Sequence, residues 1–512
     1  MSSEQLPGSA SSRTVARNGA LYFMSLGLPA ITALFLVPVT VRALGPARFG
    51  LLALAWAVAE GSGMFDFGLG RATVRFVADA TAKGKERLRE IILASVSSQT
   101  GAGILAGILL LALTPLLVER VFSISPDVLP EARSMFRVLA LHLPVLFAAS
   151  ALRSALEGAQ RFDISAALRI PGSMASVVVP AALAYAGYSL SVIMWALLAV
   201  RVTLVVISAF AVSSKLGIGP WRFPRSWTML VEMLRYSGWV AVSTALGPLL
   251  GSFDRFTVGA IVGVAGLGLY TGAAESATRF LLIPITAFSA LLPALAAADA
   301  KGGRDRALVV TRAARRQLAA LLFPLCLTLF AFAPEILSLW LAKEFAAAGT
   351  ALRILTVGVF FNGLAHLPLA LLYGSNRPDI PAKINVAQAL LYVPLTIILV
   401  RSLGITGAAI AWAARSAADL ILYEIASRQA LGSPASDSDE ESRTHRLTLA
   451  SAALSAAFLG AIWFGRSSLA VALATIIIGL AAYALLGWTQ VLSSAERRAW
   501  STLVFRVGGK TQ

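Results

Sequence analysis

Fourteen apolar segments, each long enough to cross a bilayer, follow one another along this chain. A spanning helix needs about 20 mainly apolar residues, and 57% of the 512 residues are hydrophobic while only 13% are charged. Lipid offers the backbone no hydrogen-bond partner, so each segment must be helical. The sequence therefore predicts an all-α polytopic membrane protein with about 14 transmembrane helices. These helices are expected at residues 19–43, 49–76, 90–118, 133–158, 163–187, 189–213, 236–262, 267–296, 315–341, 347–373, 380–401, 405–429, 447–465 and 468–490.

The basic residues gather in alternate loops. Loops on one side hold 26 lysines and arginines, whereas the opposite loops hold only seven. By the positive-inside rule the richer side is cytoplasmic, and both termini belong to it. The net charge of +17 therefore reflects topology, and nucleic acid is not expected as a partner. The richer loops are at 13–17, 83–89, around Arg161, and at 215–235, 301–316, 377–383, 428–446 and 497–510.

Several motifs occur twice in the same order. Residues 156–164 read L-E-G-A-Q-R-F-D-I and residues 372–380 read L-Y-G-S-N-R-P-D-I. The shared turn residues are Gly158, Arg161 and Asp163 in the first copy, and Gly374, Arg377 and Asp379 in the second. At nearly the same offset, Gly45, Ala47, Gly50 and Leu51 recur as Gly263, Ala265, Gly268 and Leu269, and Gly187, Ile193, Trp195 and Ala196 recur as Gly404, Ile410, Trp412 and Ala413. Such self-similarity indicates a duplicated half. Six helices separate the copies, so the halves keep one orientation and are related by an axis along the membrane normal.

The duplication predicts two six-helix lobes with further segments around them. The expected division is a cytoplasmic tail at 1–18, an N-lobe at 19–213, a cytoplasmic interfacial linker at 214–235, a C-lobe at 236–429, an acidic cytoplasmic loop at 430–446, two extra helices at 447–490 and a basic cytoplasmic tail at 491–512. Aromatic residues alternate with arginines in the linker, as at a membrane interface. The acidic loop has the composition of a disordered segment.

Some charged residues fall deep within the predicted helices, where each costs about 2.5–3.5 kcal/mol on insertion scales. Arg201 has no carboxylate within one turn of its own helix. Asp254 and Arg255 are adjacent and point about 100° apart on a helix, so neither neutralises the other well. We expect Arg201 and Arg255 to face a wet cavity between the lobes. Asp254 is a candidate proton or sodium site, with a structural hydrogen bond to a neighbouring helix as the alternative.

Other deep charges have a partner four residues away on the same helical face. These are Glu275 with Arg279, Arg415 with Asp419, and the ladder of Arg153, Glu157 and Arg161. These residues either neutralise one another where two helices pack through polar faces, or line the cavity. The cavity candidates are therefore Arg201, Arg279, Arg415, Arg255 and Arg153, with Asn362 and Arg353 as weaker ones, and the candidate ion-coupling or gating residues are Asp254, Glu275, Asp419 and Asp66.

Seven segments together resemble the polysaccharide or O-antigen flippase family of the multidrug/oligosaccharidyl-lipid/polysaccharide exporter superfamily. They are V-R-A-L-G-P-A-R-F-G at 41–50, F-D-F-G-L-G-R-A-T-V-R at 65–75, L-E-G-A-Q-R-F-D-I at 156–164, F-D-R-F-T-V-G-A-I-V-G at 253–263, G-L-G-L-Y at 266–270, L-Y-G-S-N-R-P-D-I at 372–380 and G-I-T-G-A-A-I-A-W at 404–412. No single motif is decisive, but their order over most of the chain is. The last two predicted helices do not contribute.

The resemblance implies two lobes in a V around a central cavity, as in the multidrug exporters of the superfamily. It implies a flippase of the bacterial inner membrane that moves a polyprenyl-diphosphate-linked oligosaccharide to the outer leaflet by alternating access, for surface polysaccharide (including lipopolysaccharide) biosynthesis. Family cavities are basic, and Arg279, Arg201 and Arg415 lie deep enough to form one. The family's aspartate on the seventh helix corresponds to Asp254. Membrane lipids, a proton or sodium counter-ion, and a glycan polymerase or ligase are the remaining expected partners.

Three other functions fit an apolar chain of this kind. An ion-coupled multidrug or cation exporter is the main alternative, although an acidic cavity would be expected for it. A membrane glycan polymerase or ligase needs a sizeable external segment, whereas the longest external loop expected here is 119–132. A passive scramblase would need no ion gradient. The sequence contains no metal-ligand cluster, phosphate-binding loop or paired-carboxylate catalytic motif, so neither a cofactor nor enzymatic activity is expected.

Overall fold

The computed structural model describes residues 12–61, 69–81, 84–218, 250–300, 304–375, 377–432, 438–464, 469–494 and 496–498. Every regular element among these residues is a helix. Ten segments in the described part of the chain are long and apolar enough to cross a membrane. Nine of them coincide with one predicted segment each, and the tenth, Gly27–Ala59, covers parts of the predicted segments 19–43 and 49–76. The other three predicted segments each overlap a described helix. The prediction of an all-α polytopic membrane protein is confirmed.

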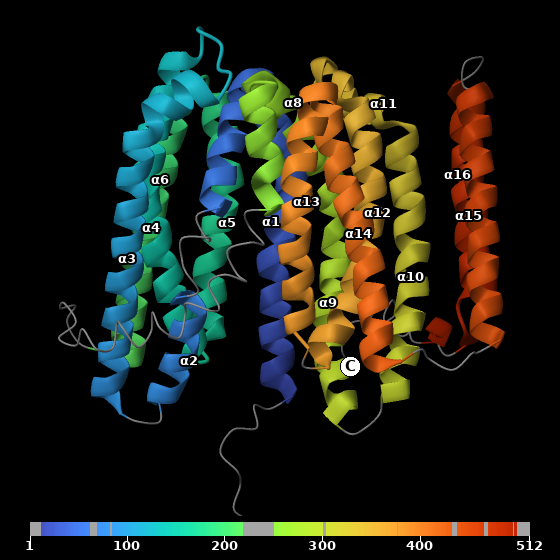
Figure 1. The fold of residues 1–512 in the computed structure, drawn as a ribbon, viewed down its shortest axis with the longest axis horizontal. Helices are drawn as coiled ribbons and strands as arrows, with labels where there is room; N and C mark the ends of the chain where they lie inside the picture. The colour runs from blue at the N-terminus through green and yellow to red at the C-terminus, as the bar shows by residue number, and fades with distance from the viewer. Residues whose placement is uncertain are drawn as a thin grey trace, which may run out of the picture. The chain divides into compact units, whose positions relative to one another are not determined.

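The first half of the chain forms long helices joined by short turns (Figure 1). They are α1 (Ser12–Gly61), α2 (Leu69–Thr81), α3 (Lys85–Leu116) with a π-helical turn at Leu117–Val121, α4 (Leu129–Gly158), α5 (Phe162–Tyr185) and α6 (Leu190–Leu216). Residues 250–261 are also helical.

The second half continues the same pattern. Its helices are α8 (Val264–Thr278), a 3₁₀ turn at Arg279–Leu281, α9 (Leu282–Ala300), α10 (Arg304–Ala331), α11 (Ala333–Trp340), a 3₁₀ helix at Lys343–Ala348, α12 (Gly349–Gly374), α13 (Asp379–Leu403), α14 (Ile405–Leu431), α15 (Ser438–Phe464), and α16 (Leu469–Leu486) with a π-helical turn at Gly487–Val491.

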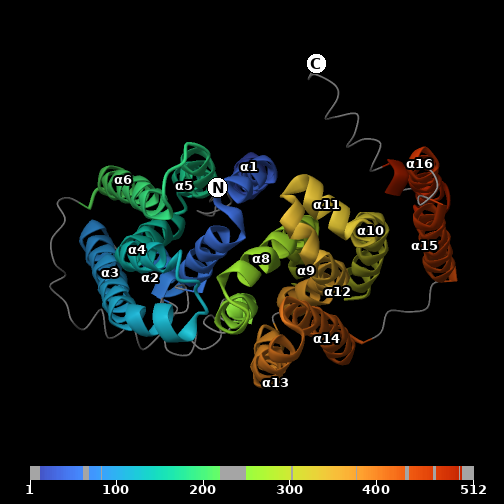
Figure 2. The same cartoon turned by 90° about the horizontal axis from the view of Figure 1, so that it is seen from above.

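One compact unit consists of residues 1–272, 337–347 and 389–408. Its central helix is α4, which contacts α2, α3 and α6 and lies between them when seen from above (Figure 2). The core residues Val77, Ile92 and Leu156 are fully or almost fully buried. Apolar side chains on the outer faces, such as Leu105 of α3 and Phe210 of α6, are exposed, as expected for surfaces that face lipid.

The second compact unit consists of residues 273–336, 348–388 and 409–512. Here α12 packs against α9 and α10, while α15 pairs with α16 and also contacts α10. The ring of Phe323 on α10 stacks on Tyr483 of α16, with centroids 6.3 Å apart. The two helices beyond the repeat are therefore packed on α10.

Equivalent positions of the two sequence copies have the same local structure. Gly45 and Gly263 both have positive φ, at 70° and 97°, and Gly187 and Gly404 have φ of 80° and 60°. Glycine occupies this left-handed region without steric cost. The shared glycines therefore mark equivalent helix junctions.

The nine-residue motif also forms the same turn twice. The Arg161 amide donates to the carbonyl of Leu156 at 2.8 Å, and the Arg377 amide donates to the carbonyl of Leu372 at 2.9 Å. Each arginine then pairs with the aspartate two residues on, at 3.1 Å for Arg161–Asp163 and 3.4 Å for Arg377–Asp379. The matched residues Gly158 and Gly374 each end a helix. These turns support the inference of a duplicated half.

The copies also touch each other at a glycine pair inside the first unit. A Cβ on Gly50 would lie 1.8 Å from the Val264 carbonyl oxygen, and a Cβ on Gly268 would lie 2.0 Å from the Pro46 carbonyl oxygen. Only glycine allows two helix backbones to approach this closely. The division into compact units therefore differs from the predicted N-lobe and C-lobe, because residues 250–272, 337–347 and 389–408 join the first unit.

Four predicted segments differ in the structure. Residues 19–43 and the start of 49–76 form one helix, α1, which is interrupted only at Gly45. The segment 267–296 is broken by the 3₁₀ turn at Arg279–Leu281. Residues 438–446 of the predicted acidic loop begin α15, with three acidic residues in its first turn, where they stabilise the positive end of the helix dipole. Residues 219–235 of the predicted linker lie outside the described residues.

Candidate functional site

A cavity of about 250 Å³ lies among α4, α5 and α6 in the first unit. Three arginines line it, one from each helix: Arg153 of α4, Arg169 of α5 and Arg201 of α6. Hydroxyl groups complete its polar surface, and they belong to Ser165, Ser173, Ser176 and Ser208. Three guanidinium groups beside several hydroxyls form a surface that suits a multivalent anion.

Two of the cavity arginines, Arg153 and Arg201, have few partners among the described residues. Among the described residues, Arg201 makes no hydrogen bond or ion pair, although it lies near the middle of α6. Arg153 donates only to the Ser150 hydroxyl, at 3.3 Å. The predicted ladder is absent from this part of the structure, since Glu157 accepts from Ser165 at 3.1 Å and Arg161 pairs with Asp163. Arg153 and Arg201 can therefore offer their donors to a ligand.

Sequence reasoning missed Arg169 and the serines. On α5, Ser165, Arg169, Gly172, Ser173 and Ser176 recur at the spacing of one helical face. A polar stripe with this period on an otherwise apolar helix was the available signal.

Asp254 takes part in a hydrogen-bonded cluster in the first unit. It is only 5% exposed. Its carboxylate accepts from the Tyr270 hydroxyl of α8 and, at 2.8 Å, from the Arg255 backbone amide. The ring of Tyr392 also lies nearby, 6.2 Å from that of Phe253. The bond from Tyr270 is the kind of contact that the structural role considered for Asp254 requires.

Asp419 forms a different buried cluster, in the second unit. Asp419 and Gln388 are 8% and 6% exposed. The carboxylate lies beside Arg415, Gln388, Tyr423 and His366. Gln388 and Tyr423 lie close enough to donate to the carboxylate, while its Oδ1 atom has no partner of good hydrogen-bond geometry among the described residues. This arrangement leaves one carboxylate oxygen available to a proton or small cation.

The remaining predicted residues lie elsewhere. Arg279 pairs with Glu275 in the second unit. The guanidinium of Arg353 donates to the Phe330 carbonyl at 3.1 Å, which leaves fewer of its donors for a ligand. Asn362 lies on α12, one turn before His366. Asp66 lies outside the described residues.

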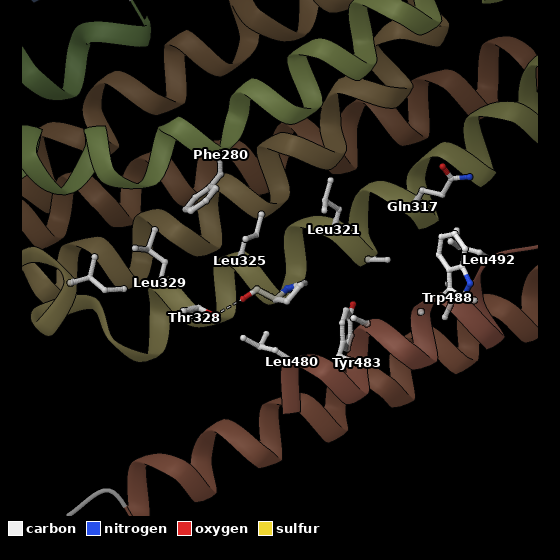
Figure 3. A pocket seen from close by; sticks show the side chains of 16 residues that line it. Phe280, Gln317, Leu321, Leu325, Thr328, Leu329, Leu480, Tyr483, Trp488 and Leu492 are labelled. Atoms are coloured by element: carbon white, nitrogen blue, oxygen red, sulfur yellow. Dashed lines mark hydrogen bonds between the residues drawn. The ribbon is translucent and has the colours of Figure 1, made fainter. Parts of the chain in front are cut away.

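A larger and mostly apolar groove, of about 730 Å³, lies between α10 and α16. Figure 3 shows Leu321, Leu325 and Leu329 of α10 on one side and Leu480 and Tyr483 of α16 on the other. Gln317 and Trp488 lie toward one end of the groove (Figure 3). The groove has the dimensions and the apolar lining of a site for a hydrocarbon chain.

Comparisons with known proteins agree on one group. A family model described as polysaccharide biosynthesis protein matches residues 39–349. A Shigella flexneri protein, whose name assigns it provisionally to O-antigen transport, is 26% identical over 416 residues, covering 80% of this chain and 97% of that protein.

Solved structures of the multidrug-resistance MATE transporters share the fold. An inward-facing member is 18% identical with a TM-score of 0.66, covering 81% of this chain and 98% of that one. An outward-facing structure gives a TM-score of 0.57 at 18% identity, covering 81% and 95%. A Pyrococcus furiosus transporter, described as having a binding pocket of reversed polarity, gives 0.58 at 16% identity over the same shares.

Proposed function

Since the chain belongs to the polysaccharide biosynthesis protein family, whose model matches more than half of it, we propose that it is a lipid-linked oligosaccharide flippase. It moves a polyprenyl-diphosphate-linked glycan from the cytoplasmic to the outer leaflet of the bacterial inner membrane, by alternating access. The Shigella flexneri relative, named for O-antigen transport, supports a substrate destined for surface polysaccharide.

The cavity of α4, α5 and α6 is the observation that carries this proposal. A diphosphate is a multivalent anion that hydrocarbon excludes, and guanidinium groups bind phosphate oxygens in pairs while keeping their charge. Arg153, Arg169 and Arg201 supply such groups, and the serine hydroxyls can bond to further oxygens of the diphosphate or the first sugar. These polar side chains would stabilise the charged headgroup of the substrate inside an otherwise apolar protein.

The groove between α10 and α16 is proposed to hold part of the polyprenyl tail. Its lining is dominated by leucines together with Phe280, Tyr483 and Trp488. An aliphatic chain in such a groove exchanges lipid contacts for protein contacts, so the groove guides the tail without strong affinity. Of the two helices beyond the repeat, α16 thereby gains a role in transport.

Asp419 is the best-placed candidate for a coupling ion, because its carboxylate is buried and Oδ1 is without a partner among the described residues. A proton or sodium ion would neutralise it. Asp254, already held by Tyr270, is proposed to position α8. A glycan polymerase or ligase would receive the flipped product.

A multidrug or cation exporter is the second candidate, because the structural neighbours include multidrug-resistance transporters. The three arginines around the cavity oppose it, since they repel a cationic drug. A polymerase or ligase would need a group of catalytic side chains. We propose transport rather than either of these enzymatic roles.

The test is flipping of a fluorescent polyprenyl-diphosphate sugar in proteoliposomes. A charge-assisted hydrogen bond contributes about 1.5–3 kcal/mol, so Arg201→Ala should lower the flipping rate about tenfold or more. Arg153→Ala should act in the same direction. Arg401→Ala is the matched control, because Arg401 is exposed at the end of α13. Unchanged flipping by both cavity variants, at equal protein level, would contradict the proposal.

A further inference from the structure

A third cavity, of about 220 Å³, lies in the second unit among α10, α12 and α14. Its polar lining consists of Thr311, Arg312 and Arg315 of α10, and Glu424, Ser427 and Arg428 of α14. It is distinct from both the arginine cavity of the first unit and the apolar groove, and the proposed transport cycle does not use it.

The described side chains give this cavity a positive charge. Glu424 Oε1 accepts from Arg315 at 3.0 Å and from Arg428 at 2.8 and 3.0 Å. Three guanidinium groups and one carboxylate line the cavity, so cationic side chains outnumber acidic ones in its lining. Glu424 holds two of the arginines in place and neutralises only one of them. A cavity with this charge and these donors is complementary to a phosphate group.

The position of the cavity indicates where that phosphate comes from. Arg428 lies in the last turn of α14, on the side where the basic loops gather, and the positive-inside rule assigns that side to the cytoplasm. Ile421 and Ile425 precede Arg428 on the same helical face, and they are 58% and 47% exposed. A phosphate bound here would thus lie directly beside an apolar surface that suits an acyl chain.

We propose that this cavity binds the phosphate headgroup of an anionic phospholipid from the cytoplasmic leaflet. Basic pockets between helices at this membrane level are suited to such headgroups. The lipid bridges α10 and α14, while its acyl chain lies along Ile425 and Ile421. It acts as a structural ligand that stabilises the cytoplasmic ends of these helices.

The experiment measures lipid retention by native mass spectrometry, after release of the whole protein from nanodiscs of phosphatidylcholine and phosphatidylglycerol. The unaltered protein should retain phosphatidylglycerol. The double variant Arg312→Gln/Arg428→Gln should retain at least fivefold less, because it loses two of the three cationic groups. Arg446→Gln, an exposed position on α15, is the matched control and should retain the unaltered amount. Equal retention by the double variant would overturn the proposal.

Two further arms separate the sources and guard against misfolding. In lipid-free detergent, phosphatidylglycerol should raise the thermal unfolding midpoint, and inorganic phosphate at the same concentration should not. An equal rise with inorganic phosphate would overturn the lipid assignment. Should the double variant fail to fold, Arg428→Gln alone provides the test, because the Arg428 side chain is 59% exposed. These readouts do not depend on flipping, so they are independent of the proposed function.

Discussion

At the scale of single residues, Gly50 and Gly268 form one of the close backbone approaches in the first unit. A Cβ at Gly268 would lie 2.0 Å from the Pro46 carbonyl oxygen and 2.9 Å from its carbon. Gly268→Ala therefore forces α1 and α8 apart and should lower the thermal unfolding midpoint, at a cost of roughly 1–3 kcal/mol.

The matched control is Gly101→Ala on α3, where a Cβ has nothing within 4 Å. Alanine favours a helix over glycine by up to about 1 kcal/mol, so this variant should unfold at the same or a higher temperature. Both midpoints are measured in the same detergent. A Gly268→Ala midpoint equal to that of Gly101→Ala would contradict the close approach.

Some residues of interest could be found from the sequence alone. Arg201 stood out because it is a charged residue deep within a predicted helix, and Gly45 and Gly263 stood out because they occupy matching positions in the two copies. The sequence could not show that Arg153 would not pair with Glu157, because an i,i+4 spacing permits an ion pair without requiring one. Arg169 was missed because its role depends on which face of α5 meets α4 and α6, which tertiary packing decides.

At the scale of elements, a buried arginine joins the two final helices to α10. Arg316 is 3% exposed and pairs with Glu440 of α15 and, at 2.6 and 2.8 Å, with Glu496. Glu496 also accepts from Gln317 at 2.7 Å and from the Ser493 amide at 2.6 Å. Ser493 and Glu496 form a reciprocal cap, since the Glu496 amide donates to the Ser493 hydroxyl at 3.2 Å.

This network predicts an acid-sensitive attachment of α15 and α16. Burial alone would raise the pKa of Glu496, but the bonds from Ser493 and Gln317 and the charge of Arg316 lower it below its ordinary value. A carboxyl with a lowered pKa in the folded protein contributes stability above its unfolded pKa, and loses it as the pH falls through the folded value. The contribution should therefore be present at pH 7 and be lost progressively as the pH falls below the ordinary glutamate pKa of about 4.3.

Hydrogen exchange of residues 469–491 tests this. At pH 7, Glu496→Gln should exchange several-fold faster than the unaltered protein, and the difference should shrink as the pH falls below about 4. Glu344→Gln, an exposed carboxylate on another element, should exchange normally in this segment. If the difference in exchange rate between Glu496→Gln and the unaltered protein did not change with pH, the charge of Glu496 would not be what stabilises this attachment.

The same elements show what the sequence could and could not reveal. The helical state of the apolar segments was predictable because lipid permits no alternative to a helix. The start of α15 at Ser438 was missed, since an acidic composition suggests a solvated loop, although serine followed by acidic residues is also typical of a helix start. The 3₁₀ turn at Arg279–Leu281 had a local signal that was missed, because Pro284 cannot donate a hydrogen bond to the carbonyl of Phe280, four residues earlier, and so disrupts the helix there.

At the scale of the whole molecule, the distribution of charge fixes orientation more firmly than any single residue does. Basic residues number 26 in one set of loops and seven in the other, and moving a lysine or arginine through the bilayer is costly. The alternation holds across fourteen predicted segments. Reversing one helix would therefore move several basic loops to the side that the positive-inside rule disfavours. We therefore expect Ser125 to face the periplasm and Glu86 to face the cytoplasm.

Cysteine labelling with a membrane-impermeant maleimide measures this orientation. The only native cysteine, Cys326, is buried and is replaced by alanine. Ser125→Cys, at an exposed turn before α4, should be labelled in intact cells. Glu86→Cys, exposed in the first turn of α3, should be labelled only after the membrane is permeabilised, because a charged reagent cannot cross the bilayer. The reverse pattern would place both termini outside the cell, and the three arginines of α4, α5 and α6 would then receive their anion from the wrong leaflet for export.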